Sequence, residues 1–291
     1  MSARGWILGG VAIVAGLAGL TAFVARKEIS WVVPTAPFQI ADDLYYVGSA
    51  GVSSFLIKTP DGDILIDGGM PNGEKRIEKS LATLGVKPTD VKILLNTHAH
   101  FDHAGDLAAL KRDTGASLAA SAGDRKALES GTYIGSEDSS FSKFTPVRVD
   151  RVLADGDTVT LGGVTLTSHV TPGHTAGCTS WTFPVKVDGQ IKQVFLSCST
   201  SVGVNRLVSK SKGPQYPGIV ADYEKTFARL KGFKADIYLA PHNEQFGLDA
   251  KRARLGKGPN PFVDPSELQT RVVASEAEFH RALTQQQEAA R

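Results

Sequence analysis

The distribution of apolar positions divides the chain into strands that alternate with helices. Runs rich in Val, Ile, Leu and aromatic residues, bounded by turn residues, indicate buried strands, whereas apolar positions that recur every three to four residues indicate helices. In the first half we expect strands at 38–47, 52–58, 63–67, 91–95 and 116–120, and helices at 74–84, 106–113 and 122–129. Gly85 and Gly115 follow two of these helices and are typical helix stops.

The second half of the chain begins with short strands and ends with helices. Strands are expected at 148–153, 158–161, 164–170, 179–187, 191–197 and 236–240, and helices at 223–230 and 265–287. Each half therefore runs from strands to helices. Two mixed sheets packed face to face, with the helices outside, would bury this pattern. We predict an α/β fold of this kind, as one domain over residues 31–291.

One loop stands out between the two halves. The segment 130–145 is rich in Gly and Ser and carries Tyr133, Phe141 and Phe144. Long loops without secondary structure are often functional. We interpret this segment as a loop at the rim of a substrate site.

The N-terminal segment has a different character from the rest of the chain. Residues 5–25 carry no charge and are followed by Arg26, Lys27 and Glu28. Such a segment is an export signal or a membrane anchor. The residues 23–25 make a poor cleavage site, but the glycines and the flanking positive charges disfavour an anchor. We favour a cleaved signal over residues 1–27. Either interpretation places the mature domain in the periplasm or outside the cell, or anchored to the inner membrane.

Composition sets further limits. The hydrophobic content of 42% and charged content of 21% are those of a globular protein with a sizeable core. The net charge is +2 and no basic cluster stands out, so nothing suggests a nucleic-acid partner. A membrane partner is expected only if the N-terminal segment stays uncleaved. The two cysteines, Cys178 and Cys198, allow at most one disulfide.

A cluster of polar residues lies between the predicted strand at 91–95 and the helix at 106–113. It holds His98, His100, Asp102 and His103 within six residues. Imidazole and carboxylate groups are good ligands for zinc-like ions. This spacing cannot direct all four side chains at one ion, so it indicates two. The alternative, a polar loop with accidental histidines, is disfavoured because the chain has only 7 histidines.

Two more histidines each follow a predicted strand. His174 lies in a Gly- and Pro-rich loop after the strand at 164–170, and His242 follows the strand at 236–240. A catalytic zinc keeps three protein ligands and one open position. Two such ions need six ligands, and these two histidines complete that number. We interpret His169 and His280 as non-ligands.

These motifs resemble those of the metallo-β-lactamase superfamily. The pattern His98-x-His100-x-Asp102-His103, followed by His174 and His242, is similar to its metal motif. More closely, the chain resembles the third subclass of the class B metallo-β-lactamases. The stretches that carry this narrower resemblance are 37–40, 44–48, 64–67, 96–105, 150–181, 216–222, 239–242 and 260–264. The resemblance implies a four-layer αβ/βα sandwich with a binuclear zinc site between the two sheets.

The resemblance also assigns roles to individual residues. It implies that His98, His100 and His174 bind the first zinc ion. It implies that Asp102, His103 and His242 bind the second. Asp67 resembles the buried aspartate of the superfamily, which orients a loop of the metal site, although it could equally be a plain turn residue before Gly68.

Cys198 departs from the pattern of the third subclass, which usually has serine at this position. Other class B subclasses have a zinc-binding cysteine there, and glyoxalase II has a bridging aspartate. Cys198 could be a thiolate ligand near the second zinc, a buried thiol, or one residue out of register, because Ser197 and Ser199 flank it. The hairpin that follows Cys178 would also bring the two cysteines close enough to pair. Our hypothesis is that both are free thiols.

The function that the resemblance implies is hydrolysis of the amide of β-lactam antibiotics by a metal-bound hydroxide, which confers antibiotic resistance. Two zinc ions per chain are the expected cofactors. Asp102 would be catalytic, because it fixes the second ion and can hydrogen-bond the nucleophile. Ser199, Thr200 and Ser201 are candidates to bind the substrate carboxylate. The alternative functions are those of another hydrolase of the superfamily, a lactonase or thioesterase. A binding module with degenerate metal sites would lack at least one ligand, and none is missing.

Overall fold

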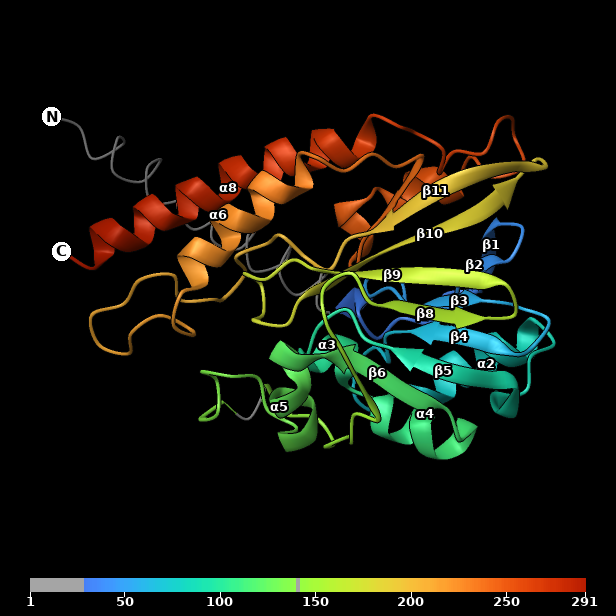
Figure 1. Cartoon of the computed structure of the whole chain (residues 1–291), viewed down its shortest axis with the longest axis horizontal. Helices are drawn as coiled ribbons and strands as arrows, with labels where there is room; N and C mark the ends of the chain where they lie inside the picture. Colours follow the sequence, from blue (N-terminus) through green and yellow to red (C-terminus); the bar gives the residue numbers. More distant parts are fainter. Residues whose placement is uncertain (1–28, 140–141) are drawn as a thin grey trace, which may run out of the picture.

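The computed structural model describes residues 29–139 and 142–291. The predicted leader at 1–27 lies outside these residues. Among the described residues, no helix has both the length and the apolar character needed to cross a membrane. Two β-sheets face each other, and helices cover the outer side of each (Figure 1). The predicted α/β fold, two mixed sheets with the helices outside, is confirmed.

The first sheet is built from the N-terminal half of the chain. Within the described residues its seven strands follow the order β1-β2-β3-β4-β5-β6-β7. They are β1 (Phe38–Ala41), β2 (Leu44–Tyr46), β3 (Phe55–Ile57), β4 (Asp63–Ile66), β5 (Val91–Leu95), β6 (Ser117–Ser121) and β7 (Arg151–Leu153). The pairs from β1 to β4 are antiparallel and the pairs from β4 to β7 are parallel.

The second sheet is built from the C-terminal half. In the described part of the chain its five strands follow the order β12-β11-β10-β9-β8. They are β8 (Thr158–Leu161), β9 (Val164–Val170), β10 (Thr179–Val187), β11 (Gln190–Leu196) and β12 (Ile237–Leu239). All pairs are antiparallel except β11 with β12, which is parallel.

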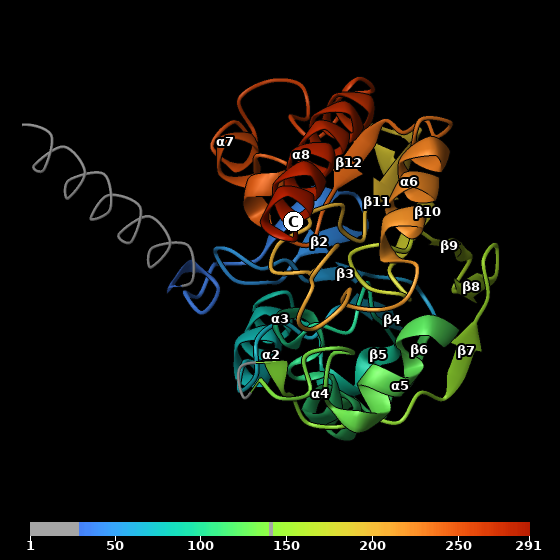
Figure 2. The same ribbon diagram turned by 90° about the vertical axis from the view of Figure 1, so that its left-hand side faces the viewer.

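Helices connect many of the strands, and most of these helices lie in the two outer layers (Figure 2). The helices are α2 (Glu74–Thr83), α3 (Phe101–Ala104), α4 (Leu107–Thr114), α5 (Ala122–Ser130), α6 (Ile219–Leu230), α7 (Leu248–Arg252) and α8 (Glu267–Ala289). Helices α2, α4 and α5 lie outside the first sheet, and α6 and α8 lie outside the second (Figure 2). Short 3-10 turns occupy Pro88–Asp90 and Asn243–Gln245.

Alternation along the strands separates the two sides of the first sheet. In β3, Phe55 and Ile57 join the core shared with the second sheet, while Leu56 joins the core beneath α2 and α4. In β4, Leu65 likewise faces the helices. Successive strand residues point to opposite faces, so an apolar strand without polar positions must be covered on both sides. Burying each large side chain of this kind contributes about 2 kcal/mol.

One expected strand is two strands in the structure. Residues 38–47 are divided by a turn at Asp42 and Asp43, so that β1 folds back on β2 with Phe38 opposite Tyr46. Two consecutive aspartates are poor strand residues and favour a turn. The expectation of one continuous strand at 38–47 is therefore wrong.

The loop at 130–145 also differs from its interpretation. The side chains of Tyr133 and Phe144 are only 4% and 7% exposed, so they pack inward instead of forming an exposed rim. Phe141 lies outside the described residues. The start of this loop is tied to the segment after β11, because Gln215 Nε2 donates a hydrogen bond of 2.8 Å to Ile134 O. The loop is thus held against the second half of the chain.

Candidate metal centre

The structure gathers the six predicted ligands into two groups of three. His98, His100 and His174 form one group, and Asp102, His103 and His242 form the other. Within each group, the candidate ligand atoms all lie within 4.8 Å of one another. The groups are neighbours, since the ring centroids of His98 and His103 are 4.2 Å apart. We call His98, His100 and His174 the first group, and the other three residues the second group.

Strand ends bring these side chains together. Four of the candidate ligands, at positions 98–103, follow β5. His174 follows β9 and His242 follows β12. His100 has an extended backbone (φ −91°, ψ 154°), and the short helix α3 begins directly after it. Side chains at alternate positions of an extended segment share one side, whereas a helical turn changes their direction. His98 and His100 can therefore face one ion while Asp102 and His103 face another.

The first group is suited to a cation because its imidazoles are neutral and have nitrogens to spare. Burial and the neighbouring imidazoles lower the pKa of His98 and His100 well below the usual value. Burial lowers the pKa of His174 to about 4. The Nε2 atoms of His98 and His100 are buried and have no hydrogen-bond partner among the described residues. Buried polar atoms normally have partners, so these nitrogens fit metal ligands.

A backbone carbonyl fixes the orientation of the His174 ring. Its Nδ1 lies 2.7 Å from the carbonyl oxygen of Ser201, a distance at which Nδ1–H donates a hydrogen bond. The Tyr223 hydroxyl donates to the same oxygen at 2.7 Å. Metal-binding histidines are typically held through the other ring nitrogen in this way. The tautomer that results leaves Nε2 of His174 available to an ion.

The second group is organised around the Asp102 carboxylate. Its Oδ2 lies 3.2 Å from His103 Nε2 and 3.3 Å from His242 Nε2. Burial alone would raise the pKa of Asp102, but the charge on His103 and hydrogen bonds from both histidines hold it well below its usual range. Burial likewise opposes charge on His103, yet Asp102 and Asp67 raise its pKa to about 10. A proton on His103 and a dication are alternatives here, because the same carboxylate stabilises both.

Asp67 connects β4 to the loop that carries four of the candidate ligands. Its Oδ1 accepts hydrogen bonds from Asn96 Nδ2 at 2.9 Å and from Thr97 N at 2.7 Å. Its Oδ2 accepts one from Thr97 Oγ1 at 2.6 Å and lies 3.4 Å from His103 Nδ1. Asp67 has a positive φ of 66°, which aspartate tolerates better than most residues. These contacts go well beyond those of a plain turn residue.

Cys198 forms a disulfide with Cys178. The hypothesis of two free thiols is therefore wrong, and in this state Cys198 has no thiolate to offer to an ion. The hairpin of β10 and β11 explains the pairing, because Trp181 lies opposite Leu196 and the two cysteines lie just beyond this pair. Cys198 is still close to the metal loop, since its Sγ lies 3.2 Å from Thr97 O. A disulfide sulfur carries no proton, so this is a contact and not a hydrogen bond.

The three candidate substrate-binding residues follow the disulfide directly. Ser199 is buried, while Thr200 and Ser201 are half-buried. The hydroxyls of Ser199 and Ser201 lie 3.2 Å apart. Ser201 is adjacent to the first group through its carbonyl contact with His174. The three residues thus lie next to the candidate metal ligands.

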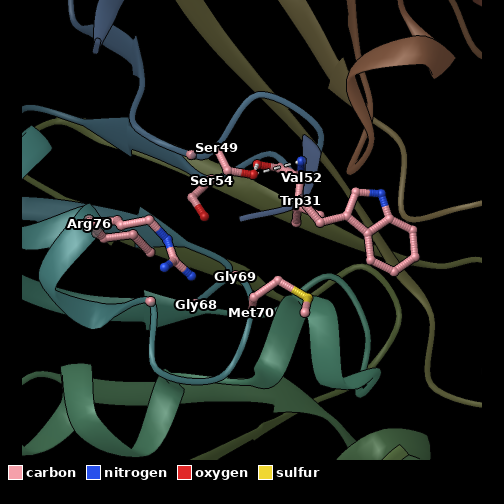
Figure 3. A pocket seen from close by; sticks show the side chains of 11 residues that line it. Trp31, Ser49, Val52, Ser54, Gly68, Gly69, Met70 and Arg76 are labelled. Carbon is pink, nitrogen blue, oxygen red and sulfur yellow. Dashed lines mark hydrogen bonds between the residues drawn. The ribbon is translucent and has the colours of Figure 1, made fainter. Parts of the chain in front are cut away.

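His169 and His280 lie outside both groups, as expected for non-ligands. His169 Nε2 lies 2.7 Å from Thr182 Oγ1, on the neighbouring strand. His280 is exposed on α8 and packs on the ring of Phe279. A small cavity of about 20 Å³ is lined by Trp31, Ser54, Gly69 and Arg76 among others (Figure 3). The Trp31 ring lies 5.3 Å from the ring of His242, between centroids, so the cavity is close to the second group. It has room for about one water molecule and is far too small for a β-lactam.

The structure places two further buried residues at the first group, Asp124, which sequence reasoning missed, and Tyr133, which it expected at the rim of the site. Asp124, in the first turn of α5, accepts hydrogen bonds from the loops on both sides of the first group. The Tyr133 ring lies 4.1 Å from the His100 ring, between centroids, and its hydroxyl is 2.9 Å from His174 O. Neither residue belongs to a motif. A single aspartate at a helix start and a tyrosine in a loop carry no signal that separates them from ordinary ones.

Known proteins resemble this chain in sequence and fold. The family model described as the metallo-beta-lactamase superfamily matches residues 47–188. BJP-1, a subclass B3 metallo-β-lactamase of Bradyrhizobium japonicum, is 45% identical in sequence and superposes with a TM-score of 0.87. The match covers 90% of this chain and 98% of BJP-1. The chain belongs to the metallo-β-lactamase superfamily. The resemblance to the third subclass of the class B metallo-β-lactamases, B3, is confirmed by the same match.

Other members of the superfamily show how far the likeness extends. LRA-12, a class B3 di-zinc metallo-β-lactamase from an Alaskan soil metagenome, is 32% identical with a TM-score of 0.80, over 87% of this chain and 96% of LRA-12. The exodeoxyribonuclease WalJ of Streptococcus pneumoniae serotype 2 is 32% identical over 115 residues, 40% of this chain and 42% of WalJ. The chain spans less than half the length of the curated relatives that it matches. The full-length likeness is thus to the B3 enzymes.

Proposed function

We propose that the protein is a zinc-dependent β-lactamase that hydrolyses the amide bond of the β-lactam ring. The observation that carries the proposal is the pair of adjacent three-residue groups, His98, His100 and His174 beside Asp102, His103 and His242. Likeness to B3 metallo-β-lactamases over about nine-tenths of the chain supports the substrate class.

The residues present fit two zinc ions. Buried, neutral imidazole nitrogens without partners and one ionised carboxylate are the donor set that zinc prefers. Zinc ions bound to these groups would polarise the amide carbonyl and make a nearby water acidic enough to ionise near neutral pH. The set holds three protein ligands per ion, which leaves a position open to water or substrate.

The protein itself supplies orientation. We infer that Asp102, whose carboxylate stays ionised, anchors the second ion and accepts a hydrogen bond from the attacking water. The hydroxyls of Ser199, Thr200 and Ser201 are proposed to bind the substrate carboxylate, because the segment that carries them contacts the first group through the carbonyl oxygen of Ser201. Hydrogen bonds from Tyr223 and His174 to Ser201 O hold the end of this segment in place.

The test is a substrate comparison with purified, zinc-loaded protein. Hydrolysis of a chromogenic cephalosporin and of a carbapenem is measured beside an acyl-homoserine lactone and an acyl thioester. We expect turnover of at least one β-lactam to exceed that of the other two by several orders of magnitude in kcat/KM. Turnover of the lactone or thioester alone would assign the chain to another hydrolase of the superfamily and contradict the proposal.

We also propose that residues 1–27 direct export and that the domain, residues 31–291, works in an oxidising compartment. The disulfide between Cys178 and Cys198 supports this, because such bonds persist mainly outside the cytoplasm. Cells that express the tagged full chain are fractionated beside cells that express a chain starting at residue 28. The full chain is expected outside the cytoplasm. Recovery from the membrane fraction would favour an anchor over a cleaved signal, and recovery from the cytoplasm would contradict export.

A further inference from the structure

We propose that the Asp124 carboxylate is a positioning residue that holds the loop of His98 and His100 at a fixed separation from the loop of His174. It would thereby preorganise the first of the two metal groups. The inference rests on the metal site of the proposed function, but not on the identity of the substrate. Asp124 does not contact the reacting atoms, so it is not a catalytic residue.

Three hydrogen bonds carry the argument. Asp124 Oδ2 accepts from Ala99 N at 2.9 Å and from Thr175 Oγ1 at 2.8 Å. Asp124 Oδ1 accepts from Gly177 N at 2.9 Å. Ala99 lies between His98 and His100, and Thr175 directly follows His174. A single carboxylate therefore joins the two chain segments that supply the first group.

The backbone is shaped to allow this contact. A Cβ atom on Gly123 would lie 2.6 Å from Ala176 O, and one on Gly177 would lie 2.2 Å from Asp124 N. Real Cβ atoms do not come so close, so the N-terminal turn of α5 can lie against the His174 loop only because both positions are glycine. Ser121 Oγ adds a hydrogen bond of 2.5 Å to Gly177 O. The approach of α5 to this loop is thus built into the sequence.

The chemistry of the side chain fits the role. Asp124 is 3% exposed and forms no salt bridge among the described residues. An unpaired buried carboxylate is costly, and burial raises its pKa to about 6. The three hydrogen bonds that its oxygens accept come from the two ligand loops and not from α5 itself. An ionised carboxylate has only hydrogen-bond acceptors, which suits the three donor groups Ala99 N, Thr175 Oγ1 and Gly177 N. Asparagine would turn an NH2 group toward one of them.

The contact of Tyr133 with the His174 backbone is easier to lose than the contacts of Asp124, because a second donor is present. Its variant therefore serves as a comparison with a smaller expected effect. The Tyr133 hydroxyl lies 2.9 Å from His174 O, but Asn205 Nδ2 donates to the same oxygen at 2.8 Å. Loss of the tyrosine hydroxyl would leave one of these hydrogen bonds in place. No such substitute exists for the Asp124 carboxylate among the described residues.

The experiment measures metal binding and not only activity. Metal-free wild type, Asp124→Asn and Tyr133→Phe are titrated with Co²⁺ against a chromophoric chelator, and the absorption of each bound ion is followed. We expect Asp124→Asn to weaken binding at the three-histidine group about 10- to 100-fold, as losses of such supporting hydrogen bonds do. The second group should change less, and Tyr133→Phe should have a smaller effect than Asp124→Asn.

A matched control is Asp63→Asn. Asp63 is also buried and accepts a hydrogen bond from a backbone N–H, that of Thr59, but it begins β4 and touches none of the ligand loops. Its variant should bind both ions like wild type. If Asp124→Asn does not fold, Thr175→Val removes a single donor from the same contact, and the same selective weakening is expected.

Two results would overturn the inference. One is wild-type affinity at both groups in Asp124→Asn. The other is equal weakening at both groups together with a lower unfolding midpoint of the metal-free protein, which would show a merely structural role. Neither depends on hydrolysis. Failure of wild-type protein to hydrolyse β-lactams would contradict the proposed function and leave this result standing.

Discussion

Asp67 and Thr97 are joined by two hydrogen bonds, one from the Thr97 backbone at 2.7 Å and one from its hydroxyl at 2.6 Å. Thr97 immediately precedes His98, so this pair fixes the start of the metal loop against the end of β4. Burial of both residues shields the contact from water. The direction in which the loop leaves β5 thus depends on Asp67, which acts on the ligands mainly through its hydrogen bonds to Asn96 and Thr97.

Replacement of Asp67 should therefore weaken metal binding without removing a candidate ligand. In Asp67→Ala the three hydrogen bonds to Asn96 and Thr97 are lost. We expect zinc affinity and kcat/KM to fall about 10- to 100-fold. Zinc content after dialysis and steady-state kinetics measure the effect. Asp67→Asn should retain more function, because asparagine also tolerates a positive φ. Full zinc occupancy and turnover in Asp67→Ala would show that the contact is dispensable.

The two histidines near β9 should behave in opposite ways. His174→Ala removes a ligand of the first group and should lower kcat by at least about 100-fold, because one of three ligands is lost. His169→Ala removes contacts with Thr182, Arg229 and Phe233, none of which is a candidate ligand, and should leave turnover nearly unchanged. Both variants are compared in one chromogenic assay with circular dichroism as the folding control. Equal losses in the two variants would mean that the ligands are assigned incorrectly.

The disulfide should contribute to stability rather than to metal binding. Closing a loop of the size between Cys178 and Cys198 is worth about 3 kcal/mol through the unfolded chain. The double variant Cys178→Ser, Cys198→Ser should lose roughly that free energy of unfolding. Urea denaturation with and without reductant measures it, and reductant should bring wild type to the level of the variant. If the variant instead keeps its stability but loses one zinc ion, the cysteines act in metal binding.

His103 predicts a pH dependence that belongs only to the metal-free protein. Its pKa in the folded chain, about 10, lies above the ordinary histidine value near 6.5. A raised histidine pKa stabilises the folded state fully below about 6.5, and this contribution is lost as the pH rises through about 10. Relative to His103→Asn, metal-free wild type should thus lose stability across this window. Urea midpoints from pH 6 to 10.5 test it, and a constant difference between the two proteins would contradict it.

The sequence predicts the ligand set well because the chemistry is rare and local. Histidines are few in this chain, and those in the two groups follow predicted strands, whose ends meet at one edge of the fold. The same reasoning finds the separation of the two sheets, because the strands alternate or remain apolar along their length. Both the ligand set and the two sheets can be predicted because each depends on a pattern that spans only a few residues.

The parts that sequence reasoning missed depend on contacts between distant segments. Asp124 matters only because α5 lies against the His174 loop, and nothing local marks that approach. Tyr133 was expected at an exposed rim, but tertiary packing buries its ring beside His100. The pairing of Cys178 with Cys198 depends on the register of β10 and β11, which the sequence suggests without fixing. Aromatic and cysteine residues fit either environment, so composition does not decide between them.

The central claim is most directly tested by titrating the metal-free protein with zinc while β-lactam hydrolysis is followed. Asp102→Ala serves as the matched variant, because it removes the carboxylate around which the second group is organised. We expect no turnover after chelation, full recovery with a plateau at two zinc equivalents per chain, and little recovery in the variant. Hydrolysis of the chromogenic cephalosporin by chelated protein, or full turnover by Asp102→Ala, would contradict the account.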